Sequence, residues 1–217
     1  MSKEETANRV FSGVVIGASA GGGKLLAELL SKLPVPYRLP ILIARHVYKH
    51  DEGLFGEFLA GYTQIPVCVP YDKTPIETNR VYAAPPDYHM LVEPGNRIAL
   101  SVDDKVRWSR PSIDVLFESA ARVWKNRLVA VVYSGANSDG ARGLSMVAAL
   151  GGIAVVQDPE TAEYPEMPLA AISAVPGALV YPPEIIVELL KKYSLAEVPR
   201  NSIVVEKHEQ QTEDTDS

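Results

Sequence analysis

The fold class is decided by residues 14–34, VVIGASAGGGKLLAELLSKLP. The run VVIG at 14–17 is typical of a short buried strand, and leucines then recur at helical spacing until Pro34 ends the helix. These leucines are Leu25, Leu26, Leu29, Leu30 and Leu33. A buried strand that turns through glycines into a helix is the opening of a β-α-β unit, so this stretch predicts an α/β fold.

The same alternation of strands and helices continues along most of the chain. Further strands are predicted at 39–45, 65–70, 128–135, 152–158 and 178–182, and further helices at 112–124, 141–150, 168–175 and 183–193. Between them, VYAA at 81–84, YHMLV at 88–92 and RIALS at 97–101 predict short antiparallel strands, the last two joined by EPGN. We therefore expect a doubly wound, mostly parallel sheet with helices on both faces and a small antiparallel hairpin insertion.

The length of 217 residues, 47% of them apolar, fits one domain with a sizeable core. We expect residues 1–12 to be an N-terminal extension, 13–193 the folded domain, and 194–217 a polar, acidic and disordered tail. Much of the net charge of −6 lies in that tail, so the folded part is nearly neutral. Without a concentrated basic face, nucleic acid is a poor candidate partner.

No export signal or membrane span is predicted from the sequence. The chain has no run of about 20 apolar residues, and its first ten residues, MSKEETANRV, have neither an apolar core nor a basic flank. Cys68 is the single cysteine and lies in the apolar stretch IPVCVP, where a buried strand residue is expected rather than a reactive thiol. These features favour a cytoplasmic protein without membrane insertion.

The glycine-rich turn GASAGGG at 17–23 is the first candidate for a functional site, and it admits three interpretations. It matches the G-x-S-x-G spacing of a nucleophile on a strand-to-helix turn, with Ser19 as the nucleophile. It also suits a phosphate cradle, although Ser19 occupies the middle glycine of G-x-G-x-x-G and no Lys-Ser/Thr pair follows Gly23. In the third interpretation Ser19 only caps the helix.

Two other reactive side chains follow predicted strands. His46 comes directly after the strand at 39–45, and Asp139 follows the strand at 128–135 within a few residues. The carboxyl ends of parallel strands share one edge of the sheet, where ligands bind, and Ser, His and Asp together can perform acyl transfer. His89 and His50 are rival bases and Asp158 is a rival orienting acid, while Asp139 alone also fits a helix cap.

The motifs that carry these residues resemble the catalytic domain of the CheB-type chemotaxis receptor methylesterase family, across about residues 13–193. The resemblance rests on six pieces in order: IGASAGG at 16–22, ARHV at 44–47, VYAAPPDYHM at 81–90, RPSIDVLFESAA at 110–121, YSGANSDGARG at 133–143, and Gln157 followed by EMPLAA at 166–171. It implies a catalytic triad of Ser19, His46 and Asp139, with oxyanion donors among backbone amides near His46 and Ala136. No metal or cofactor is implied.

By this resemblance, the substrate is a glutamate methyl ester in the cytoplasmic helices of a chemoreceptor, and glutamine deamidation is a possible second activity. Two departures from the family pattern affect the pocket: Ala20 replaces a usual Thr, and Ser134-Gly135-Ala136 replaces a usual Thr-Gly-Met. Since the first strand begins about a dozen residues into the chain, we expect no receiver domain before it. The protein is then constitutively active, controlled by a separate receiver or other chemotaxis regulator, or used outside chemotaxis.

Two other classes of function stay open from the sequence. A conventional α/β-hydrolase acting on small esters would also carry G-x-S-x-G, but that fold orders its triad as Ser, acid, His, whereas this chain has Ser19, His46, Asp139. A non-catalytic module that binds a receptor or a nucleotide is the other class. Retention of all three reactive side chains argues against it.

Overall fold

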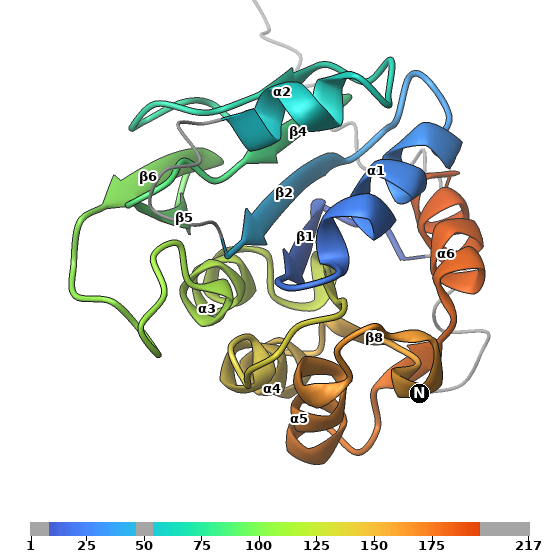
Figure 1. The fold of residues 1–217 in the computed structure, drawn as a ribbon. Coiled ribbons are helices and arrows are strands. Elements are labelled where there is room, and N and C mark those ends of the chain that lie inside the picture. Colours follow the sequence, from blue (N-terminus) through green and yellow to red (C-terminus); the bar gives the residue numbers. More distant parts are fainter. Residues whose placement is uncertain (1–8, 47–53, 196–217) are drawn as a thin grey trace, which may run out of the picture.

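The structure is a computed structural model, and it describes residues 9–46 and 54–195. In this part of the chain, the main sheet contains seven parallel strands in the order β3-β4-β2-β1-β7-β8-β9 (Figure 1). The strands are β1 (Gly13–Ala18), β2 (Pro40–Arg45), β3 (Val67–Cys68), β4 (Arg80–Ala83), β7 (Leu128–Val132), β8 (Ile153–Gln157) and β9 (Leu179–Tyr181). From β1 the chain builds toward β2 on one side and later toward β7 on the other, so the strand order reverses beside β1.

Helices cover both faces of this sheet, as expected for strands whose side chains are apolar on both sides. The helices α1 (Gly22–Lys32), α2 (Leu54–Ala60) and α6 (Pro183–Leu195) lie on one face. The other face carries α3 (Ile113–Trp124), α4 (Ala141–Ala149), α5 (Glu166–Ala174) and an antiparallel hairpin of β5 (His89–Glu93) and β6 (Arg97–Ser101). Two short 3-10 helices, η1 (Lys125–Arg127) and η2 (Pro159–Thr161), complete the described elements.

Two apolar clusters form the core, one on each face of the sheet. Alternate residues of β1 divide between them, since Val14 and Ile16 pack toward α1 and α6 while Val15 packs toward α3. All three are fully buried. Burial of each such side chain stabilises the fold by about 1.5–3 kcal/mol, so this alternation holds β1 firmly between the two layers of helices.

The predicted doubly wound α/β architecture with a hairpin insertion is confirmed, but three details differ. VYAA at 81–84 was expected to be antiparallel, which is wrong, because β4 pairs parallel with both β2 and β3. Val81, Tyr82 and Ala83 are all buried, as befits an inner strand with both faces covered. The strand predicted at 65–70 is only two residues long, Val67–Cys68, and Cys68 is half-buried.

The third difference is helix α2, Leu54–Ala60, which the periodicity of the sequence did not predict. It is only seven residues long, too short for a helical repeat of apolar positions to stand out. The division into an extension, a domain and a tail stays a prediction, since residues 1–8 and 196–217 lie outside the described part. Within that part, no helix is long and apolar enough to cross a bilayer.

Candidate active site

The three predicted site residues come together at the carboxyl edge of the sheet, beside the reversal of strand order. Ser19 follows β1, His46 follows β2, and Asp139 lies in the loop between β7 and α4. Ser19 Oγ lies 3.1 Å from His46 Nδ1, and His46 Nε2 lies 2.8 Å from Asp139 Oδ2. Strands β1 and β2 run in register, with Ala18 opposite Arg45, and this pairing places the residues that follow them side by side.

The His46 ring is oriented by its partners. A carboxylate only accepts hydrogen bonds, so the ring proton lies on Nε2 and is donated to Asp139, which leaves the Nδ1 lone pair for Ser19 Oγ–H. The ring is thus turned the other way round from the chymotrypsin-type triad, in which Nε2 faces the serine. Asn137 Nδ2 also lies 3.1 Å from Nδ1, and Asn137 Oδ1 accepts from the Asp139 amide at 2.9 Å. Asn137 was not singled out from the sequence.

Asp139 is fully buried, and its carboxylate is held mainly by the start of α3. Oδ2 accepts from the Ile113 amide at 2.7 Å, and Oδ1 accepts from the Asp114 amide and the Ser112 hydroxyl, each at 3.0 Å. The Gly140 amide also donates to Oδ1, at 3.0 Å. Backbone amides at a helix start favour negative charge, so this cradle suits an ionised carboxylate.

These contacts decide the ionisation of Asp139. Burial has the largest influence and by itself raises the pKa of the carboxyl. The hydrogen bond and the charge of His46 lower it, as do the amides of Ile113 and Asp114, and together they outweigh burial. The pKa therefore lies below its usual value, and the carboxylate is charged at neutral pH.

A second buried acid, Asp114, lies next to this cradle. Burial raises the pKa of the Asp114 carboxyl most, the Gly143 amide lowers it, and the charge of Asp139 raises it further. Arg107 and Arg142 place Nε at 3.6 and 3.8 Å from Asp114 Oδ2 and balance part of this charge. The environment thus separates the two carboxyls, with Asp139 the more acidic.

The turn that carries Ser19 is fixed by β7 and the loop after it. The Ser19 amide donates to the Ser134 carbonyl at 2.9 Å, and Ser134 Oγ donates to the Ala20 carbonyl at 2.9 Å. Gly21 has a φ of 72°, a left-handed conformation that glycine adopts without strain, and this allows the sharp turn into α1. The N-cap of α1 is Gly21 with no side-chain cap bond, so Ser19 is not a helix cap.

The Ser134 segment, where this chain departs from the family pattern, keeps a hydroxyl in the network. Ser134 Oγ accepts from the Tyr164 amide at 3.0 Å, and the Ser134 amide donates to Gln157 Oε1 at 2.9 Å. Gln157 in turn donates to the Thr161 carbonyl at 3.0 Å. These bonds connect the end of β7 to the turn that carries Ser19 and to the segment before α5.

The predicted oxyanion donors are backbone amides near His46 and Ala136. The His46 amide donates to the Ala18 carbonyl at 3.2 Å, so it cannot also bind a substrate oxygen, and the next residue lies outside the described ranges. The Ala136 amide has no acceptor within residues 9–46 and 54–195, and neither has that of Ala20. Ala20 directly follows Ser19, the position that supplies an oxyanion donor in nucleophile turns.

The rival residues have other roles. His89 is buried and uses both ring nitrogens, since Nδ1 accepts from the Ser112 amide at 3.1 Å and Nε2 donates to the Asp104 carbonyl at 3.1 Å. Asp158 caps η2 by accepting from the Glu160 amide at 3.0 Å. His50 lies outside the described residues.

A doubly wound α/β domain with a serine, a histidine and an aspartate grouped at the strand-order reversal has the architecture of a serine hydrolase. The family model "CheB methylesterase" matches residues 14–190. The chain belongs to this family.

Individual relatives agree with this assignment. A Leptospira interrogans protein, provisionally named protein-glutamate methylesterase/protein-glutamine glutaminase, is 41% identical over 179 residues, which cover 82% of this chain and 93% of the relative. The protein of that name from the group 2 operon of Bradyrhizobium diazoefficiens is 34% identical, but the match covers only 44% of its length. The crystal structure of the Thermotoga maritima CheB methylesterase catalytic domain superposes with a TM-score of 0.80 at 28% identity, covering 85% of this chain and 99% of that one.

Proposed function

We propose that this protein hydrolyses methyl esters of glutamate side chains in chemoreceptors, with Ser19 as nucleophile, His46 as general base and Asp139 as the acid that orients His46. The observation that carries the proposal is the unbroken pair of contacts Ser19 Oγ to His46 Nδ1, at 3.1 Å, and His46 Nε2 to Asp139 Oδ2, at 2.8 Å. The names of the relatives supply the substrate class, a glutamate ester or glutamine in a protein.

In the first half of the reaction, Ser19 Oγ attacks the ester carbonyl carbon while its proton passes to His46 Nδ1. The tetrahedral intermediate then breaks its bond to the methoxy oxygen, which takes the proton from His46 and leaves as methanol. Water attacks the acyl-serine ester by the same route and releases the glutamate carboxylate and Ser19. Asp139, ionised and buried, stabilises the imidazolium formed in both halves.

The amides of Ala20 and Ala136 are the donors we assign to the oxyanion of the tetrahedral intermediate. Each such donor contributes about 10²–10³-fold to kcat in a preorganised site. A glutamine side chain would follow the same steps with ammonia as the leaving group, which fits the glutaminase part of the relatives' names. Because backbone amides serve as donors, replacing the family's usual methionine with Ala136 leaves this chemistry intact.

The test measures methanol released from receptor membranes that have been methylated enzymatically. We expect Ser19→Ala to abolish the release and to keep the fold, since the hydrogen bond described for Ser19 Oγ is the one to His46, and a methyl group replaces it without crowding. The matched control is Ser31→Ala, which removes an exposed hydroxyl whose described bond is to the Glu28 carbonyl, and which should release methanol at the wild-type rate. Undiminished release by a folded Ser19→Ala protein would refute the mechanism.

A further inference from the structure

Asn137 lies beside the triad, in the loop between β7 and α4, and its side-chain amide has a fixed orientation. Its Oδ1 accepts from the Asp139 amide at 2.9 Å, so its Nδ2 hydrogens face the His46 ring, where Nδ2 lies 3.1 Å from Nδ1. Asn137 is half-buried, and the His46 side chain is 12% exposed. A side-chain donor is therefore held at the ring atom that takes up the proton of Ser19.

Two donors share the acceptor at His46 Nδ1 before the reaction starts. The ring proton lies on Nε2, so Nδ1 offers one lone pair, and Ser19 Oγ and Asn137 Nδ2 each lie 3.1 Å from it. When Nδ1 takes the Ser19 proton, it becomes a donor and can no longer accept from Nδ2. Asn137 Nδ2 then needs a new acceptor, at the moment when the tetrahedral intermediate forms.

The atom that next approaches His46 Nδ1 is the leaving atom of the substrate. It receives the proton from Nδ1, so it must come within hydrogen-bond distance of this ring nitrogen. Asn137 Nδ2 is already at that distance from the same nitrogen. The leaving atom and Asn137 Nδ2 are therefore neighbours in front of Nδ1.

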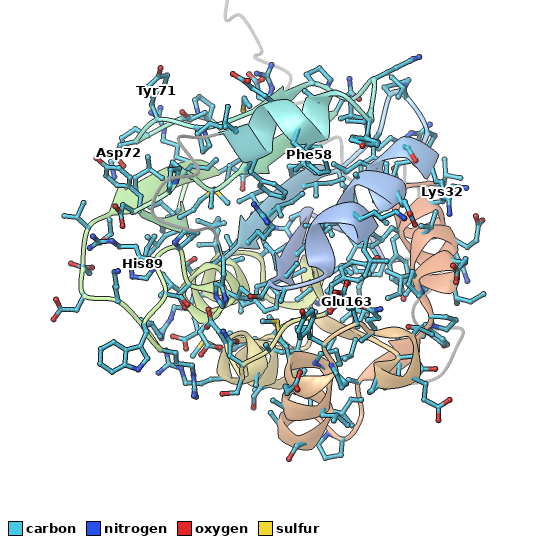
Figure 2. The ribbon with its side chains drawn as sticks, in the orientation of Figure 1. Lys32, Phe58, Tyr71, Asp72, His89 and Glu163 are labelled. Atoms are coloured by element: carbon cyan, nitrogen blue, oxygen red, sulfur yellow. The ribbon has the colours of Figure 1, made fainter. Side chains whose placement is uncertain are left out.

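The other polar side chains described around the turn before α1 are less suited to meet the leaving atom. Ser134 Oγ donates its hydrogen to the Ala20 carbonyl at 2.9 Å. Glu163 lies on the α5 side of the turn, and a Cβ placed on Gly21 would come 3.0 Å from its Oε2 (Figure 2). A carboxylate only accepts hydrogen bonds, so it has none to donate to a leaving group. Asn137 supplies a side-chain donor at the required position.

We propose that Asn137 Nδ2 donates a hydrogen bond to the leaving group and makes the enzyme selective for esters over amides. This proposal rests on the proposed function and deepens it. As the bond between the carbonyl carbon and the methoxy oxygen breaks, its electron pair stays on the oxygen. One lone pair of that oxygen takes the proton from His46 Nδ1, and another accepts from Asn137 Nδ2. This hydrogen bond forms as the leaving group departs, so it stabilises the transition state more than the bound substrate.

A glutamine side chain meets the same donor unfavourably. In its tetrahedral intermediate the nitrogen has a single lone pair, which takes the proton from His46 Nδ1, and its N–H groups are donors. Asn137 Nδ2 then faces other donors and is left without an acceptor. A polar group of the site that is left unpaired discriminates between substrates of similar shape. Asn137 therefore favours the methylesterase reaction over the glutaminase reaction.

The experiment uses three synthetic peptides that differ only in the leaving group: a glutamate methyl ester, the corresponding methyl thioester and a glutamine. Released methanol, methanethiol and ammonia are measured. All three peptides form the same acyl-serine, so differences in kcat/KM report the departure of the leaving group. Asn137→Ala should lower kcat/KM for the ester about ten-fold, as expected for the loss of one hydrogen bond. For the thioester the fall should be less than about two-fold, because sulfur is a weak acceptor, and for glutamine there should be none.

The ratio of the ester and thioester values comes from one preparation, so it does not depend on the fraction of the variant that is folded. One matched control is Asn126→Ala, which removes an exposed amide on η1, at the amino end of β7. The other is Ser138→Ala in the same loop, which removes a hydroxyl that accepts from Arg107 Nη1 at 2.9 Å. Both controls should keep the wild-type ratio.

Two kinds of failure can be told apart. A fall for the ester that either other peptide matches, or no fall at all in Asn137→Ala, would overturn the proposal and leave the esterase function standing. Absence of methanol from the ester peptide and from methylated receptor membranes, with the wild-type protein, would refute the function itself.

Discussion

Gly135 offers a direct test of how the position of Ser19 is set. Its amide donates to the Tyr164 carbonyl at 3.0 Å and its carbonyl accepts from the Met167 amide at 2.8 Å, so its backbone is fixed on both sides. A Cβ on this residue would overlap Met167 Cε and lie 3.0 Å from Met167 Sδ and 2.9 Å from Ser19 Cβ. Since Gly135 is not among the residues with positive φ, alanine fits the backbone there, and the effect of Gly135→Ala is purely steric.

Two contributions to the effect of Gly135→Ala can be separated. The Met167 thioether is flexible and can move away from the added Cβ. Such overpacking typically lowers the free energy of unfolding by about 1–3 kcal/mol. Ser19 Cβ is held by the turn, so relief of that contact displaces Oγ from His46. A misplacement on the order of 1 Å at a reacting atom costs about 10²-fold in rate, which is the loss of kcat expected.

The assay combines methanol release with urea unfolding of single and double variants. Met167→Ala in the Gly135→Ala background should recover part of the stability that overpacking removed, and a double-mutant cycle measures this as a coupling free energy between the two positions. The double variant should not recover the activity. Gly177→Ala is the matched control, because a Cβ there would meet no atom within 4 Å. Near wild-type kcat in Gly135→Ala, or full recovery of activity on Met167→Ala, would refute direct contact between residue 135 and the nucleophile.

Two further substitutions test the buried polar network. Asp139→Asn should lower kcat by about 10⁴-fold, because an amide facing Nε2 disfavours the tautomer that activates Ser19, and circular dichroism should show an intact fold. The pKa of Asp139 is lowered in the folded state, so the ionised carboxylate stabilises the fold above about pH 4, and this stabilisation is lost as pH falls through the folded pKa. The free energy of unfolding of Asp139→Asn, measured with urea, should therefore vary less with pH below about 4 than that of the wild type. Ser134→Ala should cost about 1–3 kcal/mol in unfolding free energy, since the Ala20 carbonyl and the Tyr164 amide each lose a partner, and a wild-type urea midpoint would contradict this network.

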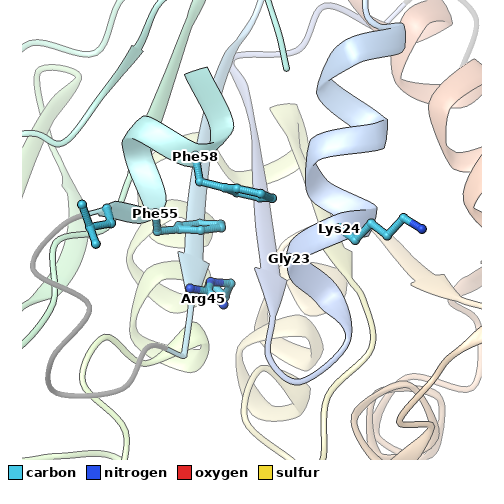
Figure 3. Close-up of a pocket in the computed structure, with 6 residues that line it drawn as sticks. Gly23, Lys24, Arg45, Phe55 and Phe58 are labelled. Carbon is cyan, nitrogen blue, oxygen red and sulfur yellow. The ribbon is translucent and has the colours of Figure 1, made fainter. Parts of the chain in front are cut away.

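Local sequence patterns predicted most of the helices and strands. They failed where the direction of a strand depends on the strands it pairs with, far away in the chain. The helix begun by Ser112 has its expected cap, with the Ser112 hydroxyl accepting from the Val115 amide, and its apolar positions are buried. The pattern of VYAA at 81–84 correctly predicts a strand, but whether that strand is parallel depends on β2, about 40 residues earlier in the chain. Alternation of side chains with a period of two does not specify which strand is the partner. Helix α2 is too short for its own periodicity to identify it, yet its Phe55 and Phe58 line a pocket together with Arg45 (Figure 3).

The site was predictable in position but not in geometry. Placing Ser19, His46 and Asp139 after strands predicts that they share one edge, because parallel strands end together. The sequence alone could not separate a catalytic Asp139 from a cap of the following helix. In the structure the N-cap of α4 is Gly140, without a side-chain cap bond, and the Asp139 carboxylate instead accepts from amides at the start of α3, a helix more than 20 residues earlier in the chain. A carboxylate fixed by a distant helix can hold His46 steady while the turn of Ser19 changes, so substitutions at Ala20 or Ala136 should alter the pocket before they alter the triad.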